Sequence, residues 1–415
     1  MKFHQEPQGE GATIYGRFIT FAPPSTCVLR NSSGSQRIVA SPGSAQPGDW
    51  VESRAGVLHV LTPNRAGRTR WMEHALDPRR LRAADMRTQV EGAIREFFRS
   101  RDFRETRTPL LVPCPGMEPH IRPYRAEPAA EGSAQKSVYL PTSPEFAMKR
   151  LLAGGLERIF QLCPAFRDEP NSVTHHPEFT ILEWYRAFAG YEEIMRDTEE
   201  LFEFIARRVH GRPSLTYQGQ EIDVSAPWPR LRVRDLFREI AGIDLVACST
   251  RESLARECER LGLGAPAEDE TWDDVYFRIW LNLIEPRLPA GRAVFVTRYP
   301  ASQAALSVID SDPDGSRWAR RFEAYAGGLE LGNAFEELTD PEEQRRRFTK
   351  DMELRARTYG PGFPVNPLDE SFLGALAEGI PPSGGIAMGV DRMVMLFADE
   401  PEIDYTVWLS ARDLH

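Results

Sequence analysis

The sequence has few of the features that mark a secreted, membrane-bound or disulfide-stapled protein. Five cysteines occur in 415 residues, and no two of them have CxxC spacing or belong to a zinc-binding pattern. An odd number of cysteines in a chain of this length favours free thiols in a reducing compartment. No apolar run approaches the roughly 18 residues that cross a membrane, and the N-terminus lacks the apolar core of a signal peptide. We therefore expect a cytoplasmic protein that makes no membrane contact.

Basic residues are fewer than acidic residues in this sequence. Acidic residues number 61 and basic residues 51, for a net charge of −10, which excludes a uniformly basic nucleic-acid-binding surface. Only Lys2, Lys136, Lys149 and Lys350 are lysines, so a lysine within a motif is conspicuous. The hydrophobic fraction of 41% is that of a globular protein with an ordinary core. The length predicts one large domain and a small one.

The N-terminal segment differs from the rest of the chain. Short runs with β character alternate with turns rich in Pro, Gly and Ser, at 13–21, 27–29, 36–40, 50–52 and 57–61. This pattern predicts a small OB-like β-barrel over residues 1–65. Residues 1–70 contain eight basic and four acidic side chains, and are therefore mildly basic. Contact with nucleic acid and a role in packing or dimerisation both remain open for this module.

A second domain is predicted over residues 75–415. It begins after a linker with a helix over 77–101 and a strand that ends near Pro109. Further segments are a surface loop (126–136), alternating helices and strands (145–210), a mostly helical insertion or connector (213–300), and strands with one terminal helix (321–397). The mixture predicts an α+β fold.

The first chemically suggestive segment runs from Arg167 to Tyr185. An apolar strand ends at Arg167-Asp168-Glu169, and on the strand that follows, Phe179, Glu183 and Tyr185 share one face by alternation. A core face is not expected to carry these groups, because burial of an unpaired carboxylate costs free energy. A charged strand facing solvent and a strand lining a cleft both remain open.

Two later segments suggest nucleotide chemistry. Glu323 and Glu330, separated by glycines, can converge on one divalent cation, and their oxygen ligands suit Mg²⁺ that bridges nucleotide phosphates. In the Gly-rich stretch 382–392, Gly389 lets a ligand approach the backbone and Arg392 suits a phosphate. Each of these signals alone occurs in many proteins.

Taken in order, the segments resemble the three signature motifs of class II aminoacyl-tRNA synthetases. The motifs would be the helix at 77–101 with its strand, the segment 167–185, and Gly389-Val-Asp-Arg392. Residues 142–152, 177–185 and 330–340 are similar to the lysyl branch. Within that branch, Glu-Trp-Tyr at 183–185 and Glu-Leu-Thr-Asp at 337–340 are most similar to the ligases that attach lysine or (R)-β-lysine to elongation factor P. The resemblance covers about residues 75–410. It implies an antiparallel sheet of six or seven strands flanked by helices, and a homodimer formed through 77–109.

The resemblance also implies a role for each matching residue. The residues that would bind ATP are Arg167, Asp168, Glu169, His176, Phe179, Glu330, Leu331, Gly389 and Arg392, with Mg²⁺ on Glu323 and Glu330. Those that would bind the amino acid are Ser143, Pro144, Glu145, Glu183, Tyr185, Asn333, Glu337 and Ala387. Arg167 and Arg392 would be the catalytic residues. Because no nucleophile or strong base is needed, catalysis would consist of positioning and electrostatic stabilisation.

Three positions depart from the family pattern. His176 stands where the family usually has Asn, and Thr174 stands where lysyl-tRNA synthetases have a basic residue. Ala387 stands where those synthetases generally have Gly; its methyl group favours a β-amino acid, by at most about 1–3 kcal/mol. Lys149 and Arg150 are interpreted as helix surface and Cys163 as strand core.

Three functions are compatible with these observations. The first is an AMP-forming ligase that transfers a lysine-type amino acid to a lysine side chain of elongation factor P. The second is a lysyl-tRNA synthetase-like enzyme that charges tRNA, which the N-terminal module favours, because lysyl-tRNA synthetases carry an OB-fold there. The third is a non-catalytic paralogue acting as a binding module, against which the retention of both arginines and all the carboxylates counts.

Overall fold

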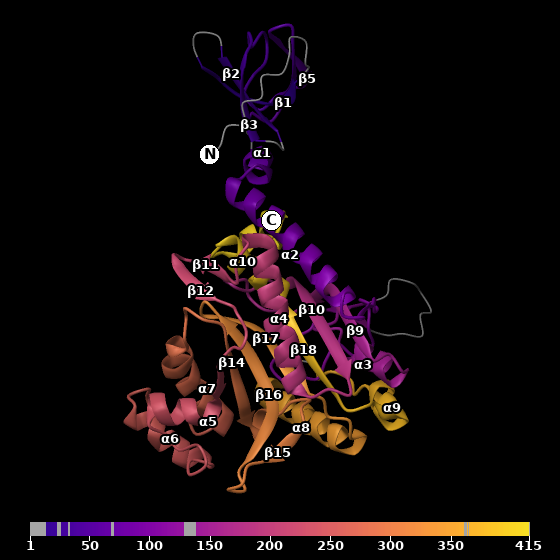
Figure 1. Cartoon of the computed structure of the whole chain (residues 1–415), viewed down its shortest axis with the longest axis vertical. Helices are drawn as coiled ribbons and strands as arrows, with labels where there is room; N and C mark the ends of the chain where they lie inside the picture. Colours follow the sequence, from indigo (N-terminus) through magenta and orange to yellow (C-terminus); the bar gives the residue numbers. More distant parts are fainter. Residues whose placement is uncertain are drawn as a thin grey trace. The chain divides into compact units, whose positions relative to one another are not determined.

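The computed structural model describes residues 14–22, 26–31, 34–67, 70–127, 138–360, 363 and 365–414. Two compact units are present, one formed by residues 1–85 with 407–415 and the other by residues 86–406 (Figure 1). Most of the loop predicted at 126–136 lies outside the described residues. No helix among the described residues is long and apolar enough to cross a membrane.

The smaller unit contains a five-stranded antiparallel sheet in the order β3-β2-β1-β4-β5. Its strands are β1 (Ile14–Ala22), β2 (Thr26–Asn31), β3 (Gly34–Val39), β4 (Trp50–Arg54) and β5 (Val57–Thr62). Alternation turns Phe18, Leu29 and Val51 to one face, where they form a core. The unit also contains α1 (Arg70–Ala75), the start of α2 (Pro78–Arg99) and the 3-10 helix η7 (Ala411–Leu414).

The predicted β-barrel is not confirmed, because this sheet is not closed. Among the described residues, the edge strands are linked only by a bridge from Ser41, just past β3, to Val57 of β5. Ser41 N–H donates to Gly56 O and Ser41 O accepts from Leu58 N–H, each at 2.8 Å. The next residue is Pro42, which has no N–H group with which to extend the pairing.

The larger unit is built on a nine-stranded sheet, whose main path is β13-β14-β16-β17-β18-β10-β9-β6, with β15 paired to β16. The six strands from β14 to β9 are antiparallel to their neighbours, whereas β13 and β6 pair in parallel at the two ends. The prediction of an antiparallel sheet of six or seven strands agrees with these six central strands. The strands β6, β13 and β15 have only two or three residues, too few for alternation to mark them.

The bounds of the elements in this unit are as follows. The strands of the large sheet are β6 (Arg104–Glu105), β9 (Arg158–Phe166), β10 (Glu178–Ala187), β13 (Arg230–Arg232), β14 (Val294–Pro300), β15 (Ile309–Ser311), β16 (Arg317–Ala326), β17 (Leu329–Glu336) and β18 (Ser383–Gly389). Two further pairs are β7 (Arg125–Ala126) with β8 (Val138–Tyr139), and β11 (Ser214–Tyr217) with β12 (Gln220–Asp223). The α-helices are α3 (Glu145–Ala153), α4 (Tyr191–His210), α5 (Val233–Leu236), α6 (Arg251–Arg260), α7 (Trp272–Ile279), α8 (Pro341–Tyr359), α9 (Glu370–Gly379) and α10 (Val390–Ala398). Short π or 3-10 segments are η1 (Phe237–Ala241), η2 (Trp280–Ile284), η3 (Glu285–Arg287), η4 (Ala301–Gln303) and η6 (Ile403–Tyr405).

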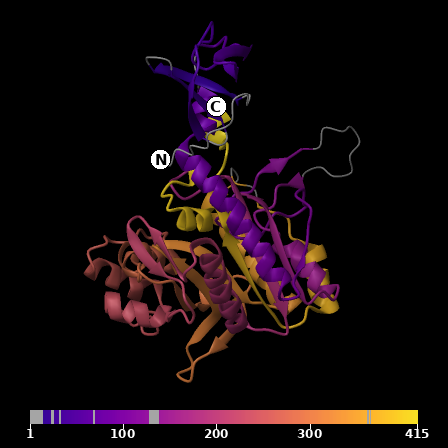
Figure 2. The same cartoon turned by 45° about the horizontal axis from the view of Figure 1, so that its top comes forward.

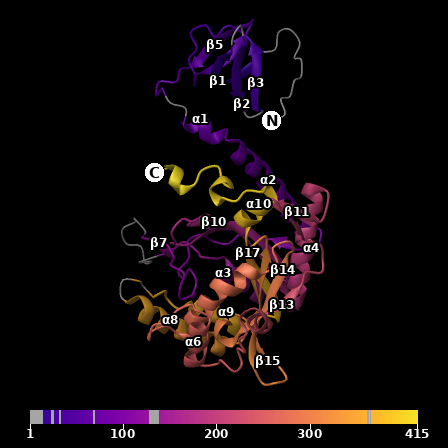
Figure 3. The same ribbon diagram turned by 90° about the vertical axis from the view of Figure 1, so that its left-hand side faces the viewer.

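Helices cover the two faces of the large sheet differently. The ring of Phe98 on α2 stacks on Phe160 of β9 at 4.8 Å and lies 5.2 Å from Trp184 of β10. Figure 3 shows α4 on one side of the sheet and α3, α8 and α9 on the other. Because neighbouring side chains on a strand point to opposite faces, Glu183 points away from α2, toward the side of α3.

Residues 213–300 form a subdomain at one end of the sheet. Figure 2 shows most of this segment gathered at one side of the larger unit, and its core residues Phe237, Tyr276 and Trp280 pack with Val294 and Val296 of β14. It contains helices and also the pair β11–β12 and the strand β13.

Candidate active site

The register of the large sheet brings predicted site residues from distant segments into two adjacent rows. One row across β10, β18, β17 and β16 consists of Glu183, Ala387, Asn333 and Glu323; the next consists of Tyr185, Gly385, Phe335 and Arg321. Residues in register on adjacent strands project to the same face. The sheet therefore holds the amino-acid residues and one predicted metal ligand side by side.

Glu183 is fully buried and hydrogen-bonded. Its Oε1 accepts from Ser143 Oγ at 2.7 Å, and its Oε2 accepts from the Tyr185 hydroxyl at 3.0 Å. Burial, followed by the charge of Glu145, raises the pKa of Glu183 to about 8. The solvent-facing interpretation of this strand is therefore excluded, since the polar face of β10 lies inside the protein.

Lys149 on α3 lies between two of the predicted substrate-binding carboxylates. Its Nζ is 2.5 Å from Glu145 Oε1 and 2.5 Å from Glu337 Oε2, and the side chain is 1% exposed. The helix-surface interpretation of Lys149 is therefore wrong. The neighbouring Arg150 lies at the edge of the helix, where it pairs with Asp369 at 2.6 Å. The spacing of four residues between Glu145 and Lys149 could have indicated that both side chains lie on one face of the helix.

Arg392, at the start of α10, is held by three contacts. Its Nη1 donates to the backbone oxygen of Glu330 at 2.7 Å, its Nε to that of Thr174 at 3.3 Å, and its Nη2 lies 2.6 Å from His175 Nε2. Burial and then the charge of Arg392 lower the pKa of His175, so the neutral imidazole can accept this hydrogen bond.

The two adjacent histidines have different partners. His175, which was not among the predicted site residues, contacts Arg392, whereas the predicted ATP ligand His176 places Nε2 2.6 Å from Asp404 Oδ1. His175 is therefore the imidazole beside the predicted phosphate-binding arginine.

Arg167 lies at the end of β9 with its guanidinium 5.1 Å from the centre of the Phe179 ring. Its Nε is buried and has no hydrogen-bond partner among the described residues. A buried N–H without an acceptor costs free energy, which an anionic oxygen at this point would recover. The following residue, Asp168, pairs with Arg122, with 3.0 Å between its Oδ2 and Arg122 Nε.

Glu323 and Glu330 form the second carboxylate pair. Glu323 accepts hydrogen bonds from Tyr299 at 2.5 Å, Tyr325 at 2.8 Å and Arg321 at 2.6 Å. Leu331 is skipped in the β16–β17 register, which pairs Tyr325 with Glu330, and this bulge brings Glu330 onto the face of Glu323.

The donor set of this pair fits a divalent cation. Burial and the charge of Glu323 raise the pKa of Glu330 to about 7. A cation between the two carboxylates would relieve this repulsion, and Mg²⁺ takes few protein ligands when phosphates supply the rest. No group of three or more His, Cys, Asp or Glu side chains that could hold a metal occurs in the described part of the chain.

A further carboxylate, Glu118, was not foreseen. Its Oε2 lies beside Gly116, where an added Cβ would come within 2.5 Å of that oxygen and 2.6 Å of Thr142 Oγ1. The loop is fixed by Arg355, whose Nη1 donates to Glu118 O at 3.1 Å and Ile121 O at 2.9 Å. Burial and the charge of Glu145 raise the pKa of Glu118. Sequence patterns could not identify Glu118, because a single glutamate between prolines and glycines matches no motif.

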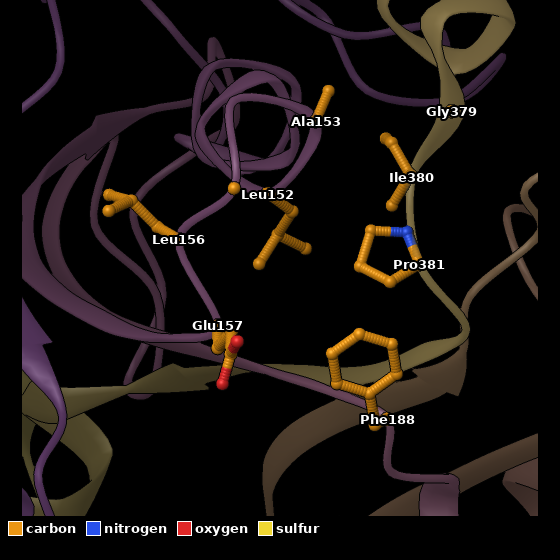
Figure 4. Close-up of a pocket in the computed structure, with 9 residues that line it drawn as sticks. Leu152, Ala153, Leu156, Glu157, Phe188, Gly379, Ile380 and Pro381 are labelled. Atoms are coloured by element: carbon orange, nitrogen blue, oxygen red, sulfur yellow. The ribbon is translucent and has the colours of Figure 1, made fainter.

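A separate hollow of about 440 Å³ lies between the end of α3 and the end of α9 (Figure 4). Leu152, Ile380 and Phe188 face it, and Glu157 is the only acidic or basic side chain on its wall. It shares no residue with the carboxylate and arginine clusters. The hollow offers no basic side chain for a phosphate, and Glu157 is the one carboxylate among its lining residues.

A family profile described as "tRNA synthetases class II (D, K and N)" matches residues 64–411. The chain belongs to this family. Its members are ATP-dependent ligases, and in this chain the match includes every predicted site residue and leaves β1 to β5 outside.

Curated relatives support the same assignment. The chain is 36% identical over 329 residues to a protein named lysine–tRNA ligase from Dehalococcoides mccartyi, an alignment that covers 78% of this chain and 63% of the relative. It is 33% identical over 338 residues to a lysine–tRNA ligase from Pelotomaculum thermopropionicum, covering 81% and 64%. It is 35% identical over 336 residues to one from a Synechococcus species, covering 81% and 65%. The chain thus spans a little under two thirds of the length of these class II synthetases.

Proposed function

We propose that this class II synthetase-like protein uses ATP and Mg²⁺ to activate a lysine-type amino acid as its aminoacyl-adenylate. The observation that supports this proposal is the pair of buried carboxylates Glu183 and Glu337, on the side of the sheet that also carries Asn333 and Glu323, with the partly buried Glu145 of α3 joined to Glu337 through Lys149. Several buried carboxylates select a ligand with more than one ammonium group, because a neutral ligand would leave them unpaired.

The amino acid would lie along the row from Glu183 to Asn333. Glu145 would bind the amino group nearest the reacting carboxylate, and Glu183, Tyr185 and Glu337 would surround the distal ammonium. Ser143 fixes Glu183 by its hydrogen bond of 2.7 Å. Asn333 Oδ1, which accepts from Arg321 Nε at 3.0 Å, leaves its amide N–H groups to hold the substrate carboxylate.

ATP would bind between Arg167 and Arg392. Phe179 would stack on the adenine ring, with Asp168, Glu169 and His176 around the nucleotide, and Gly389 and Leu331 would lie along it. Mg²⁺ would be held by Glu323 and Glu330 and would neutralise the phosphate charge. Arg392 is already fixed by its contacts with Glu330 and His175, so its charge costs little to organise.

In the reaction, a carboxylate oxygen of the amino acid attacks the α-phosphorus of ATP. A new P–O bond forms, the bond to the pyrophosphate oxygen breaks, and the electron pair leaves with pyrophosphate. Arg167 would neutralise charge at the α-phosphate and Arg392 charge on the leaving group. The anhydride is then attacked by a nucleophile of the acceptor, and AMP is released.

Two acceptors fit different observations. The names of the relatives favour tRNA, and so does a face of the smaller unit on which Tyr15 and Trp50 are exposed and the Arg17 guanidinium lies 4.7 Å from the Trp50 ring. A lysine side chain of elongation factor P is favoured by the motif variants at 183–185 and 337–340, and by Ala387 beside Glu183 and Asn333. The comparisons support tRNA more directly.

Homodimer formation through residues 77–109 is also part of this proposal. The neighbouring Leu110 and Leu111 are 38% and 58% exposed, as expected of apolar residues that a second copy would cover. Sedimentation of the purified protein would detect the dimer.

A labelling experiment distinguishes the acceptors. The protein is incubated with ATP, Mg²⁺ and labelled lysine or (R)-β-lysine, with elongation factor P and bulk tRNA offered in parallel. Base-labile label on tRNA would establish tRNA charging, whereas label on the protein that resists mild base would establish an amide on elongation factor P. Pyrophosphate exchange without labelling of either acceptor would contradict both.

The KM for lysine is expected to fall as the pH rises from about 6.5 to about 8.5. The pKa of Glu183 is raised to about 8 by burial, so below that pH the empty site holds a proton that the incoming ammonium must displace. The distal ammonium of lysine, which Glu183 would bind, stays charged up to about pH 10, so this contact is not lost within the range measured. Pyrophosphate exchange at a series of pH values measures this, with the exposed Glu353→Gln variant as a matched control. A KM independent of pH over this range would contradict the assignment of Glu183.

A further inference from the structure

Lys149 is a cation already built into the predicted ammonium-binding site. Its Nζ contacts carboxylate oxygens of Glu145 and Glu337, each at 2.5 Å, and lies 6.0 Å from the Tyr185 ring centre. The side chain is 1% exposed. The two carboxylates come from α3 and from the end of β17, so Lys149 connects two elements that would contact opposite ends of the amino acid.

We propose that Lys149 is a specificity-determining residue, whose fixed charge makes the site electrically neutral when an amino acid with two ammonium groups is bound. The proposal rests on the function proposed above. The count includes the three glutamates assigned to the ammonium groups, Glu145, Glu183 and Glu337. When these are ionised, they and Lys149 have a net charge of −2, which two ammonium groups cancel. The substrate carboxylate has its own partners in Arg167 and Asn333.

The ionisable groups around Lys149 show why the net charge of the site matters for binding. The ionisable groups whose charges act on Lys149 or on its two carboxylates are Glu145, Glu183, Tyr185, Glu336, Glu337 and Glu118. Burial raises the pKa of Glu337 to about 8, and the Lys149 ammonium opposes this rise. Without Lys149, a bound diamino acid would leave one buried negative charge uncompensated, or the site would retain a proton in place of an ion pair.

Lys149 is not placed to accept the activated amino acid itself. Both neighbouring carboxylates raise its pKa, so the nitrogen stays protonated and has no lone pair for attack on the anhydride. Its role is therefore to set charge and position.

The test is pyrophosphate exchange with lysine, comparing the full-length protein with Lys149→Met, Lys149→Arg and the double variant Lys149→Met with Glu337→Gln. Lys149→Met is expected to raise the KM for lysine about tenfold or more near pH 7, with the KM for ATP changed less than about twofold. The double variant is expected to bind lysine better than Lys149→Met alone, because removal of the second charge restores neutrality. A residue that merely fills space would not give this reversal.

The controls separate this inference from the proposed function. If the unaltered protein shows no lysine-dependent exchange, the proposed function fails. If it shows exchange but Lys149→Met leaves the KM for lysine unchanged, or the double variant is worse than the single one, the charge-matching role of Lys149 is refuted. Should Lys149→Met not fold, Lys149→Arg decides: it retains the charge and must keep the KM for lysine within about threefold, and a larger loss would overturn the proposal.

Discussion

Arg392→Ala is expected to reduce ATP–pyrophosphate exchange about 100- to 1,000-fold, with little effect on the folded structure. The guanidinium is fixed in advance by Glu330 O at 2.7 Å and His175 Nε2 at 2.6 Å, so its charge is in place before the pyrophosphate leaves. Alanine removes that charge and leaves the leaving group without its partner. Exchange at saturating lysine and ATP measures the loss.

The control for this prediction is Arg346→Ala. Arg346 is 74% exposed on α8 and lies outside the predicted site, so its removal should leave exchange unchanged. Arg392→Lys should recover only part of the activity, because an ammonium cannot reproduce three contacts at the angles of the guanidinium. Exchange by Arg392→Ala at the unaltered rate would remove Arg392 from the reaction.

Much of this site could be predicted from the sequence, because its residues lie on strands. Alternation alone placed Phe179, Glu183 and Tyr185 on one face of β10, and the structure shows that Glu183 and Tyr185 are buried together. The spacing of Glu323 and Glu330 suggested a pair, and the register of β16 and β17 places both side chains on one face of the sheet. Local periodicity was sufficient for the residues on β10, whereas the pair of glutamates was inferred from residue chemistry alone.

The parts that were missed depend on contacts between distant segments. Lys149 was interpreted as surface because a lysine on a short helix usually is, and only the packing of α3 against β10 and the end of β17 buries it. The position of Glu330 on the site face depends on the bulge at Leu331. No residue type at this point of the sequence predicts a bulge. The partner of His176 lies at Asp404, more than 200 residues away in the sequence.

In the N-terminal module, the sequence predicted the positions of the strands but not how they pair. The five strands were predicted near their observed positions, since each alternates and is bounded by turn residues. Closure into a barrel depends on whether β3 and β5 pair along their length, which local sequence does not encode. The structure links them at Ser41 alone among the described residues, and Pro42 ends that pairing.

Gly385→Ala is expected to weaken lysine binding strongly while ATP binding persists. Gly385 lies on β18 in register with Tyr185, and an added Cβ would overlap the Tyr185 ring and come within 2.5 Å of Glu337 Oε1. Both residues belong to the proposed distal-ammonium site, and both are buried, so neither can move aside without losing its contacts. We expect the KM for lysine to rise about 100-fold or more, by the loss of at least two charge-assisted contacts.

The matched control for this change is Gly374→Ala on α9, where an added Cβ meets no atom within 4 Å. That variant should retain full exchange and gain about 0.5–1 kcal/mol in the free energy of unfolding, because alanine loses less backbone entropy in a helix.

If Gly385→Ala kept the lysine KM of the unaltered protein, the amino acid would have to bind away from Tyr185 and Glu337. If it lost ATP binding as well, the two halves of the site would not be separable, since the row through Ala387, Asn333 and Glu323 would transmit the displacement across the sheet. The expected split between lysine and ATP therefore tests whether the carboxylate cluster and the arginine cluster act as distinct subsites of one active site.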